Sequence, residues 1–510
     1  MAQERAVNNI GTRQLFAPYF KARWQNMQNI KNEVFYALVP KNYLTYYNAF
    51  IRQWMEWASG FVKALHKTDF FSTGMGYTVC DIFATECTSG GLRYESTNKK
   101  AQSFITDWAE KNLNDKLCDM FFYSNAGGNC ILKVTPVNGK IIVDVVPIDR
   151  VFFQEGRDGI TYAQILNRFI AGSDSCYYAR ETRVKMDGKP YYKVDLSKQA
   201  NEQVLSPVWN ANFQDGIPEG IANAWAETYG DIMPGVWYEL PSSFNTLGVY
   251  NVRNKGCAVA LSGIPGYSDS TLHTALDVLY SIDYNYSQGQ LDQYFGRSRV
   301  LIPSEFVKQG EKKIVNGESF VEIMDAPLKD DFFLRLPGRT SIDGKEPEPK
   351  FLQPDLRAEQ RKFIRDADLE LLASKVGLSS ATLANHLSYN GTKTATQVND
   401  EQDTTEKSVK IKRKLASKAI NAMLKDIAQY YGFFDDVKII FTSASGNSTQ
   451  ENDQLRQDYE AGLLPLREYI KRRHPDLDEE TIEKWVQDIK QEQKEKREAE
   501  QAKPFYGLNL

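Results

Sequence analysis

The residues of this 510-residue chain that could carry out chemistry are few and widely separated. The four histidines lie far apart in the sequence: His66, His273, His386 and His474. None belongs to an H-E-x-x-H motif or a Cys/His cluster, so the sequence does not predict a zinc site. The six cysteines contain no C-x-x-C pair, and in a chain of this length we interpret them as reduced core residues.

Motifs for phosphate binding and nucleophilic catalysis are absent as well. Neither G-x-x-x-x-G-K-[ST] nor G-x-S-x-G occurs, which argues against ATP hydrolysis and against a serine hydrolase. The pairs Gly139-Lys140, Gly188-Lys189 and Gly344-Lys345 are better interpreted as hairpin turns than as phosphate-binding loops. Acidic pairs at 330–331 and 435–436 could bind a metal ion, but adjacent carboxylates in turns are more often solvent-exposed.

One segment stands out by its position between two strongly helical regions. It consists of Leu387, Ser388, Tyr389, Asn390, Gly391, Thr392 and Lys393. Its small polar residues predict a loop, and Lys393 by itself is typical of a surface lysine. A loop held between helices, in a chain without a catalytic motif, favours a part of a molecular machine over an enzyme.

Composition indicates an ordinary globular protein, with 42% hydrophobic and 25% charged residues. The length favours about three domain-sized units. A net charge of -4 argues against tight binding of nucleic acid over the whole surface, because such affinity rests on clustered Lys and Arg. The N-terminus lacks the features of a signal peptide, and no run approaches the roughly 18 apolar residues of a membrane span. We therefore expect a soluble protein made in the cytoplasm.

The order of predicted helices and strands indicates that the first half of the chain is an α+β region. Aromatic residues at three- and four-residue spacing predict a helix within 42–65, and a second helix is predicted from Lys99 to Phe122. Turns and β-branched runs then predict an antiparallel sheet. Its strands are expected at 129–135, 140–147, 151–154 and 159–169, followed by short strands near 177, 191–194 and 236–240 and a polar loop at 210–230.

Long helices dominate the second half of the chain. Ser268 follows a Gly/Pro-rich break and is predicted to cap a helix that reaches Phe295. Pro354 suits the first turn of a second helix, which ends near Val376, and a third is predicted from Thr394 to Tyr431. Strands are predicted at 299–302, 318–323, 332–336 and 437–442, and short helices at 452–460, 466–473 and 478–500.

This order of elements resembles that of the portal proteins of tailed bacteriophages, of the type found in siphophages of Gram-positive bacteria. The resemblance covers most of the chain and rests on the segments Gly127–Val134, Val143–Val151, Gln288–Gly296 and Thr394–Val398. The first two are similar to the β region of the portal wing, and the last is similar to the T-A-T-E-V of the family. Gln397 replaces the usual Glu of that motif, so no role for a carboxylate is carried over.

The resemblance implies an α+β portal fold with named regions. These are a wing (1–265), a first stem helix (268–296), a clip containing β structure (297–353), a second stem helix (354–376), a tunnel loop (377–393), a long wing helix with a strand (394–446) and a helical crown (447–510). Residues Leu387 to Lys393 of the tunnel loop are then expected to face a DNA channel. The clip is expected to supply the surface for terminase and for a head-tail adaptor.

The function that the resemblance implies is structural. A homo-oligomeric ring, usually a dodecamer, would form in the host cytoplasm and occupy one capsid vertex of the virion. Double-stranded DNA would pass along its axis during packaging and ejection, and the partners would be terminase, the adaptor, and the major capsid and scaffolding proteins. The ring would need no cofactor, no metal and no membrane, and it would not be an enzyme. An acidic chain suits this role, because tight phosphate binding would slow the passage of DNA.

Two other functions remain open on the sequence alone. Another phage connector or structural ring protein would also lack catalytic motifs, although a short connector would lack the order helix, β segment, helix, loop, helix. A metal-dependent nucleic-acid-processing enzyme would need a metal site, for which the Asp330-Asp331 region is the candidate. A nuclease assay with magnesium distinguishes that enzyme from both structural proteins.

Overall fold

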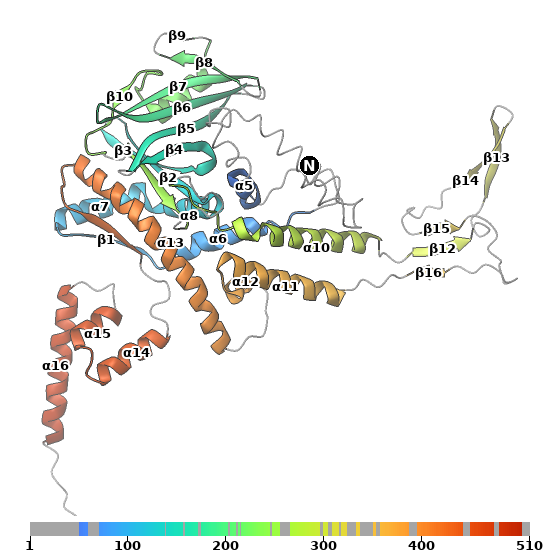
Figure 1. Ribbon diagram of the computed structural model, residues 1–510. Coiled ribbons are helices and arrows are strands. Elements are labelled where there is room, and N and C mark those ends of the chain that lie inside the picture. Colours follow the sequence, from blue (N-terminus) through green and yellow to red (C-terminus); the bar gives the residue numbers. More distant parts are fainter. Residues whose placement is uncertain are drawn as a thin grey trace, which may run out of the picture. The chain divides into compact units, whose positions relative to one another are not determined.

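The protein is an α+β protein, as predicted, and its computed structural model divides into two compact units (Figure 1). The first unit comprises 1–87 and 94–438, and the second comprises 88–93 and 439–510. The structure describes residues 50–59, 71–137, 139–156, 159–171, 175–201, 204–210, 213–214, 216–244, 247–255, 266–295, 299–303, 309–315, 318–323, 333–336, 350–352, 358–386, 395–441, 449–473 and 479–501. Within these ranges, no helix is both long and apolar enough to cross a bilayer.

The N-terminal part of the first unit is helical. It contains α5 (Arg52–Ala58), α6 (Met75–Thr88), α7 (Lys99–Asn112) and α8 (Leu117–Gly127). The single helix predicted from Lys99 to Phe122 is wrong, because a 3-10 turn at Asn114–Lys116 separates α7 from α8. The Asn112 side chain donates to the Trp108 carbonyl at 2.7 Å, and such local bonds compete with helical ones. Helix α6 was not predicted from the sequence as a separate helix. Its exposed stripe, Tyr77, Asp81 and Thr85, is narrow, and most of its other residues are buried.

Two antiparallel sheets follow α8. The smaller has the order β11-β2-β3, with β2 (Asn129–Val137), β3 (Lys140–Pro147) and β11 (Val249–Arg253). The larger has the order β4-β5-β6-β7-β8-β9, with β10 on β7. Its strands are β4 (Val151–Gly156), β5 (Gly159–Ala171), β6 (Ser175–Met186), β7 (Lys189–Asn201), β8 (Val204–Asn210), β9 (Phe213–Gln214) and β10 (Tyr238–Glu239).

The turns of these hairpins are of the kind that the sequence predicts. Between β6 and β7, Asp187 and Gly188 both have positive φ, 51° and 80°, as a two-residue Asp-Gly turn requires. Gly139, at the turn between β2 and β3, has φ 76°. Both Gly-Lys pairs therefore belong to hairpins, as expected, whereas Gly344-Lys345 lies outside the described residues.

The polar loop predicted at 210–230 is wrong over most of its length, because helix α9 (Glu219–Tyr229) lies there. Its buried residues Ile221, Trp225 and Tyr229 recur every four positions and pack on the larger sheet in a cluster with Tyr177, Val194 and Leu196. The Trp225 indole N–H donates to the Ile232 carbonyl at 2.9 Å. The four-residue spacing of these apolar residues was present in the sequence, but the Glu, Asn and Gly residues between and around them favoured a loop.

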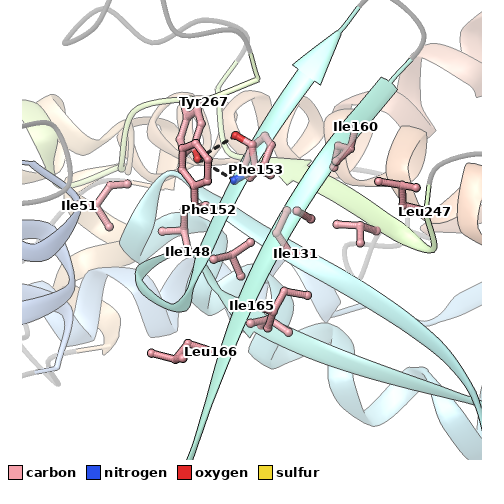
Figure 2. Packing of buried hydrophobic residues seen from close by; sticks show 14 of the residues in the cluster. Ile51, Ile131, Ile148, Phe152, Phe153, Ile160, Ile165, Leu166, Leu247 and Tyr267 are labelled. Atoms are coloured by element: carbon pink, nitrogen blue, oxygen red, sulfur yellow. Dashed lines mark hydrogen bonds between the residues drawn. The ribbon is translucent and has the colours of Figure 1, made fainter. Parts of the chain in front are cut away.

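One core cluster joins the two sheets to the helices (Figure 2). It brings together Ile51, which directly precedes α5, Ile131 of β2, Phe153 of β4 and Ile165 of β5. Tyr267 stacks on Phe153 with ring centroids 4.4 Å apart, and its hydroxyl contacts the Phe153 backbone N–H and carbonyl at 3.3 Å. The chain that leads from β11 toward the long helices is therefore fixed to the sheets before those helices begin.

The first long helix, α10 (Leu276–Phe295), begins eight residues later than Ser268, the cap that the sequence predicts. Ser268 is fully buried, and its hydroxyl donates to the Gly128 carbonyl at the end of α8 instead of capping a helix. Ser270 likewise donates to the Asn125 carbonyl at 2.9 Å. Residues 268–271 thus bond to the end of α8 through their polar groups, and a 3-10 turn at His273–Ala275 leads into α10.

A β segment separates α10 from α11 (Ala358–Val376). Its strands are β12 (Arg299–Pro303), β13 (Gln309–Val315), β14 (Glu318–Ile323), β15 (Phe333–Leu336) and β16 (Lys350–Leu352). β12 pairs in parallel with β15 and antiparallel with β16, while β13 and β14 form a hairpin. The strands predicted at 299–302, 318–323 and 332–336 are found, whereas β13 and β16 were not predicted.

Helices α12 (Ser380–His386) and α13 (Ala395–Tyr430) complete the helices of the first unit. α13 agrees within one residue at each end with the helix predicted from the sequence. The second unit contains residues of the strand pair β1 (Leu92–Ser96) and β17 (Val437–Phe441), together with α14 (Thr449–Glu460), α15 (Leu466–Arg473) and α16 (Glu479–Gln501). Tyr459 of α14 stacks on Tyr469 of α15 at 4.7 Å, which joins two of these helices.

Candidate functional site

The candidate residues Leu387 to Lys393 lie outside the described residues, and the structure defines the helices on both sides of them. The first part of the predicted loop is not a loop. Gly377, with φ 81°, ends α11, and its N–H and that of Leu378 both donate to the Ala373 carbonyl at 3.0 Å. α12 then occupies 380–386, so the segment that joins two helices is shorter than the sequence predicts.

Hydroxyl groups fix α12 against α13 beside this segment. The Thr405 hydroxyl of α13 accepts the Ser379 backbone N–H at 2.8 Å and lies 3.1 Å from the Thr382 hydroxyl. Ser379 also caps α12, since its hydroxyl accepts the Thr382 N–H at 2.9 Å. Ser379 and Thr405 are 3% and 5% exposed, so these bonds are shielded from water. The two helices that flank the candidate residues are therefore held together.

Helices α10 and α11 lie side by side and are joined by polar bridges (Figure 1). Lys375 pairs with Asp277 at 2.9 Å, and this hydrogen bond lowers the pKa of Asp277. The remaining bridges run from Asp368 to Ser281 at 3.0 Å and to Asn285 at 2.8 Å, and from Arg361 to Asp292 and to the Gly289 carbonyl. On α11 these residues recur every seven positions, so they form one face that points at α10.

Large apolar side chains lie on the outer surfaces of the same two helices. Tyr286 of α10 is 49% exposed, and Phe363, Ile364 and Leu371 of α11 are 76%, 45% and 49% exposed. Phe363 lies on the side of α11 opposite the bridging residues. Exposed aromatic and aliphatic side chains on two adjacent helices favour a face that another protein covers.

Helix α13 is anchored on the first unit by a buried lysine. Lys412 is 7% exposed, and its ammonium group donates to the side-chain oxygens of Asn254 and, at 2.9 Å, of Thr271. It also lies 4.4 Å from the centroid of the Phe83 ring. Burial lowers the pKa of Lys412 to about 7, while the Cys87 and Cys80 thiols oppose this shift and Lys255 adds to it. The hydrogen-bonding oxygens around it are neutral.

Two further contacts hold α13 in place. Asp426 accepts the Tyr250 hydroxyl of β11 at 2.6 Å, and Arg413 donates to the Cys87 and Glu86 carbonyls at the end of α6, both at 3.0 Å. The sequence did not single out Lys412, Arg413 or Asp426, because each reads as a surface charge of a helix rich in lysine. The one sequence signal for their burial is that they lie on the side of the helix that also carries Ala416 and Ile420.

A metal centre finds no support in the part of the chain that the structure describes. No group of three or more His, Cys, Asp and Glu side chains comes together there. Asp435 accepts a hydrogen bond from Asn98 at 2.9 Å and Asp436 pairs with Lys425 at 2.9 Å, so both have protein partners. Asp330 and Asp331 lie outside the described residues. Cys80 and Cys87 are buried free thiols, and burial raises the pKa of each to about 12.

The chain is similar to known proteins in two of three comparisons. The sequence model of a family described as "Phage portal protein, SPP1 Gp6-like" matches residues 247–502. No curated protein matches the chain. Among solved structures, a chain in the virion of a native gene transfer agent particle has 9% identity and a TM-score of 0.39, and the match covers 76% of this chain and 84% of that one. A chain in the neck of the native particle, computed with C12 symmetry, has 10% identity and a TM-score of 0.39, with 78% and 88% covered.

Proposed function

Because the chain belongs to the phage portal protein family of the SPP1 Gp6-like type, we propose that it assembles into a ring through which DNA enters and leaves a capsid. The observation that carries this proposal is the family match over 247–502, which spans α10 to α13 and most of the C-terminal helices. The ring occupies one vertex of the virion after assembly in the host cytoplasm. It acts as a structural channel, while a separate terminase supplies the ATP-driven work.

The regions of this portal follow the order of its elements. The described residues up to β11, together with α13 and β17, form the wing, α10 and α11 the stem, β12 to β16 the clip, and α14 to α16 the crown. Residues 387–393 form the tunnel loop between α12 and α13. The clip binds terminase and a head-tail adaptor, and the ring also contacts the major capsid and scaffolding proteins. The hydroxyl contacts at Thr405 support this assignment, because they hold the helices that would project the loop into the channel.

The exposed apolar residues of the stem support a ring of identical subunits. In a closed ring, each subunit presents one surface to the next and a different surface to the previous one. The polar bridges hold α10 and α11 together, so Tyr286, Phe363 and Leu371 remain available for a neighbour. Buried aromatic residues contribute much of the energy of such interfaces. We therefore assign the outer surfaces of α10 and α11 to the contact between subunits.

Replacing Phe363 by serine is expected to weaken ring assembly, because an aromatic side chain at the centre of an interface contributes about 2 kcal/mol or more. The purified wild-type protein should appear in negative-stain images as rings with a central hole, and light scattering should give the mass of a ring. In the variant, the fraction of monomers should rise.

Phe434→Ser is the matched control, since Phe434 is 81% exposed in the turn after α13 and outside the stem. It should assemble as the wild type does. If the wild-type protein is found only as compact monomers, the ring is refuted. If both variants assemble equally well, only the assignment of the stem surface is refuted.

Deleting Ser388 to Gly391 tests the tunnel loop. The shortened protein should still form rings, because the stem and the Thr405 contacts are intact, but filled capsids should become several-fold rarer or lose their DNA. The measurement is packaged DNA per capsid during assembly and after storage. Replacing the same four residues by Gly-Ser-Gly-Ser keeps the length of the segment. This variant distinguishes an effect of the segment's length from an effect of its side chains. Unchanged packaging and retention in the deleted ring would rule out a role in the channel.

A further inference from the structure

A basic surface runs along α13, on the side away from the core. Between Lys407 and Lys425 the sequence contains seven basic residues and no Asp or Glu, although the whole chain has a net charge of -4. Two of the seven, Lys412 and Arg413, contact other parts of the first unit. The other five are exposed, and we call them the lysine row: Lys407, Lys410, Lys414, Lys418 and Lys425.

The lysine row occupies one face of the helix. At 3.6 residues per turn, its members fall within about 60° of a common line. The opposite face carries the buried residues Val409, Ala416, Ile420 and Leu424, so the helix cannot turn the lysines inward. With a rise of about 1.5 Å per residue, the row from Lys407 to Lys425 is about 27 Å long. The helix is held by Lys412, Arg413 and Asp426, so this row is a fixed feature of the surface.

Among the residues that the structure describes, few acidic partners neutralise this positive charge. Lys410 pairs with Glu406 at 3.1 Å and Lys425 with Asp436 at 2.9 Å, both in exposed ion pairs that contribute little and are screened by salt. Lysines at 410, 414 and 418 follow one another at intervals of four, a spacing at which like charges destabilise a helix. Such an arrangement is favourable when an external anion lies along it.

The composition of the row selects the kind of partner. The cores of protein interfaces are depleted of lysine and enriched in aromatic residues and arginine. Here the apolar residues of the same face are Ile411, which is 58% exposed, and Ala422. Lysine ammonium groups bind phosphates as point charges, without the fixed geometry of arginine. A row of about 27 Å matches the length of roughly eight base pairs of duplex DNA at 3.4 Å each.

We propose that the lysine row of α13 binds the phosphate backbone of double-stranded DNA. This inference rests on the proposed function, and it adds a second DNA contact separate from the tunnel loop. Binding is independent of base sequence, because lysines contact phosphates and do not reach base edges. It also depends steeply on salt, because each contact releases counterions. The row would give a protein with a net negative charge one local surface that binds DNA.

The test measures binding of a short fluorescent duplex to the purified full-length protein over a series of sodium chloride concentrations. In the triple variant Lys407→Gln, Lys414→Gln, Lys418→Gln, the slope of log K against log salt should fall by up to about 2.7 for each subunit that contacts the duplex, since each phosphate contact contributes about 0.9. The variant should keep its fold, because glutamine is a good helix former and like-charge repulsion is removed. Circular dichroism during heating checks this.

The control carries the same change of charge on another exposed helix surface, Lys99→Gln, Lys100→Gln, Lys111→Gln of α7. Its slope should stay near that of the wild type. Equal slopes for the two triple variants would overturn the proposal, because the effect would then reflect net charge. Loss of ring assembly in the α13 variant, with its slope unchanged, would also overturn it by showing that the row binds another subunit. A lower slope in protein that never forms rings would support the DNA contact and refute the proposed function.

Discussion

Replacing Arg183 by methionine is expected to lower the free energy of unfolding of the first unit by about 3–5 kcal/mol, the usual cost of leaving one partner of a buried ion pair alone. Arg183 of β6 is fully buried and donates to Glu181 at 2.6 Å. It also donates to the Thr135 hydroxyl and to the carbonyls of Val134 and Leu247, each at 2.8 Å. One guanidinium group therefore joins the larger sheet to both β2 and the chain before β11.

The effect should be large because nothing replaces these bonds. Glu181 is fully buried, and although burial raises its pKa, Arg183 and Lys133 more than reverse this and hold the pKa at about 2. Without Arg183, the carboxylate keeps Lys133 at 3.2 Å, and the bonds from Arg183 to three buried acceptors are lost. Methionine fills much of the volume but donates nothing, so the loss reflects hydrogen bonds and charge more than packing.

Arg180→Met provides the matched control in a urea titration. Arg180 lies on the same strand, but its side chain is 32% exposed and its ion pair with Asp195 spans 3.2 Å. Its loss should cost less, because Asp195 keeps its ion pair with Lys193 at 3.2 Å. Similar losses in the two variants would show that β6 is sensitive to any substitution and that Arg183 has no special part in joining the sheets.

Replacing Lys412 by methionine is expected to remove a pH dependence of stability from the first unit. The pKa of Lys412 is lowered from its ordinary 10.5 to about 7 in the folded protein. Between these values the unfolded chain holds a proton that the folded chain lacks, so the free energy of unfolding rises with pH through this window. Below pH 7 both states are protonated and this contribution is constant. In the window the slope reaches about 1.4 kcal/mol per pH unit.

The methionine variant should therefore show a flatter dependence of stability on pH between pH 7 and 10, because its side chain binds no proton. Asn254 and Thr271 keep the 3.3 Å contact between them. Urea unfolding at several pH values measures this slope. Lys414→Met, on an exposed position of the same helix, should change stability by less than about 0.5 kcal/mol. A slope that persists in Lys412→Met would assign the dependence to another group.

The sequence correctly predicted those elements that depend on residues close together in the chain. The hairpins β2–β3 and β6–β7 have glycines at turns that need positive φ, and α13 has a long periodic apolar face. Ser268 shows where such reasoning fails. It has the residue type and the position of a helix cap, but its hydroxyl donates to Gly128, 140 residues earlier in the chain. A tertiary hydrogen bond displaced the local one, and no window of sequence contains both partners.

The candidate site was predictable in outline. The helices now seen as α10, α11 and α13 could be predicted from periodicity, whereas α12 was not predicted. The family match over 247–502 agrees with the resemblance seen in the sequence. The contacts that hold these helices could not be read in this way. Thr405 and Lys412 are polar residues in a charged helix, and their burial depends on partners far away in the sequence. The role of residues 387–393 in the channel stays a prediction.

The bridges between α10 and α11 restrict how this helix pair can move. Lys375, Asp368 and Arg361 are evenly spaced, so a slide of α11 by one helical turn, about 5.4 Å, would separate all of them from their partners at once. Small axial displacements are therefore opposed together, and the two helices have one favoured register. If a channel is built from such helix pairs, it would widen or narrow by tilting each pair as one rigid unit. The bending would then occur where the chain enters and leaves the pair.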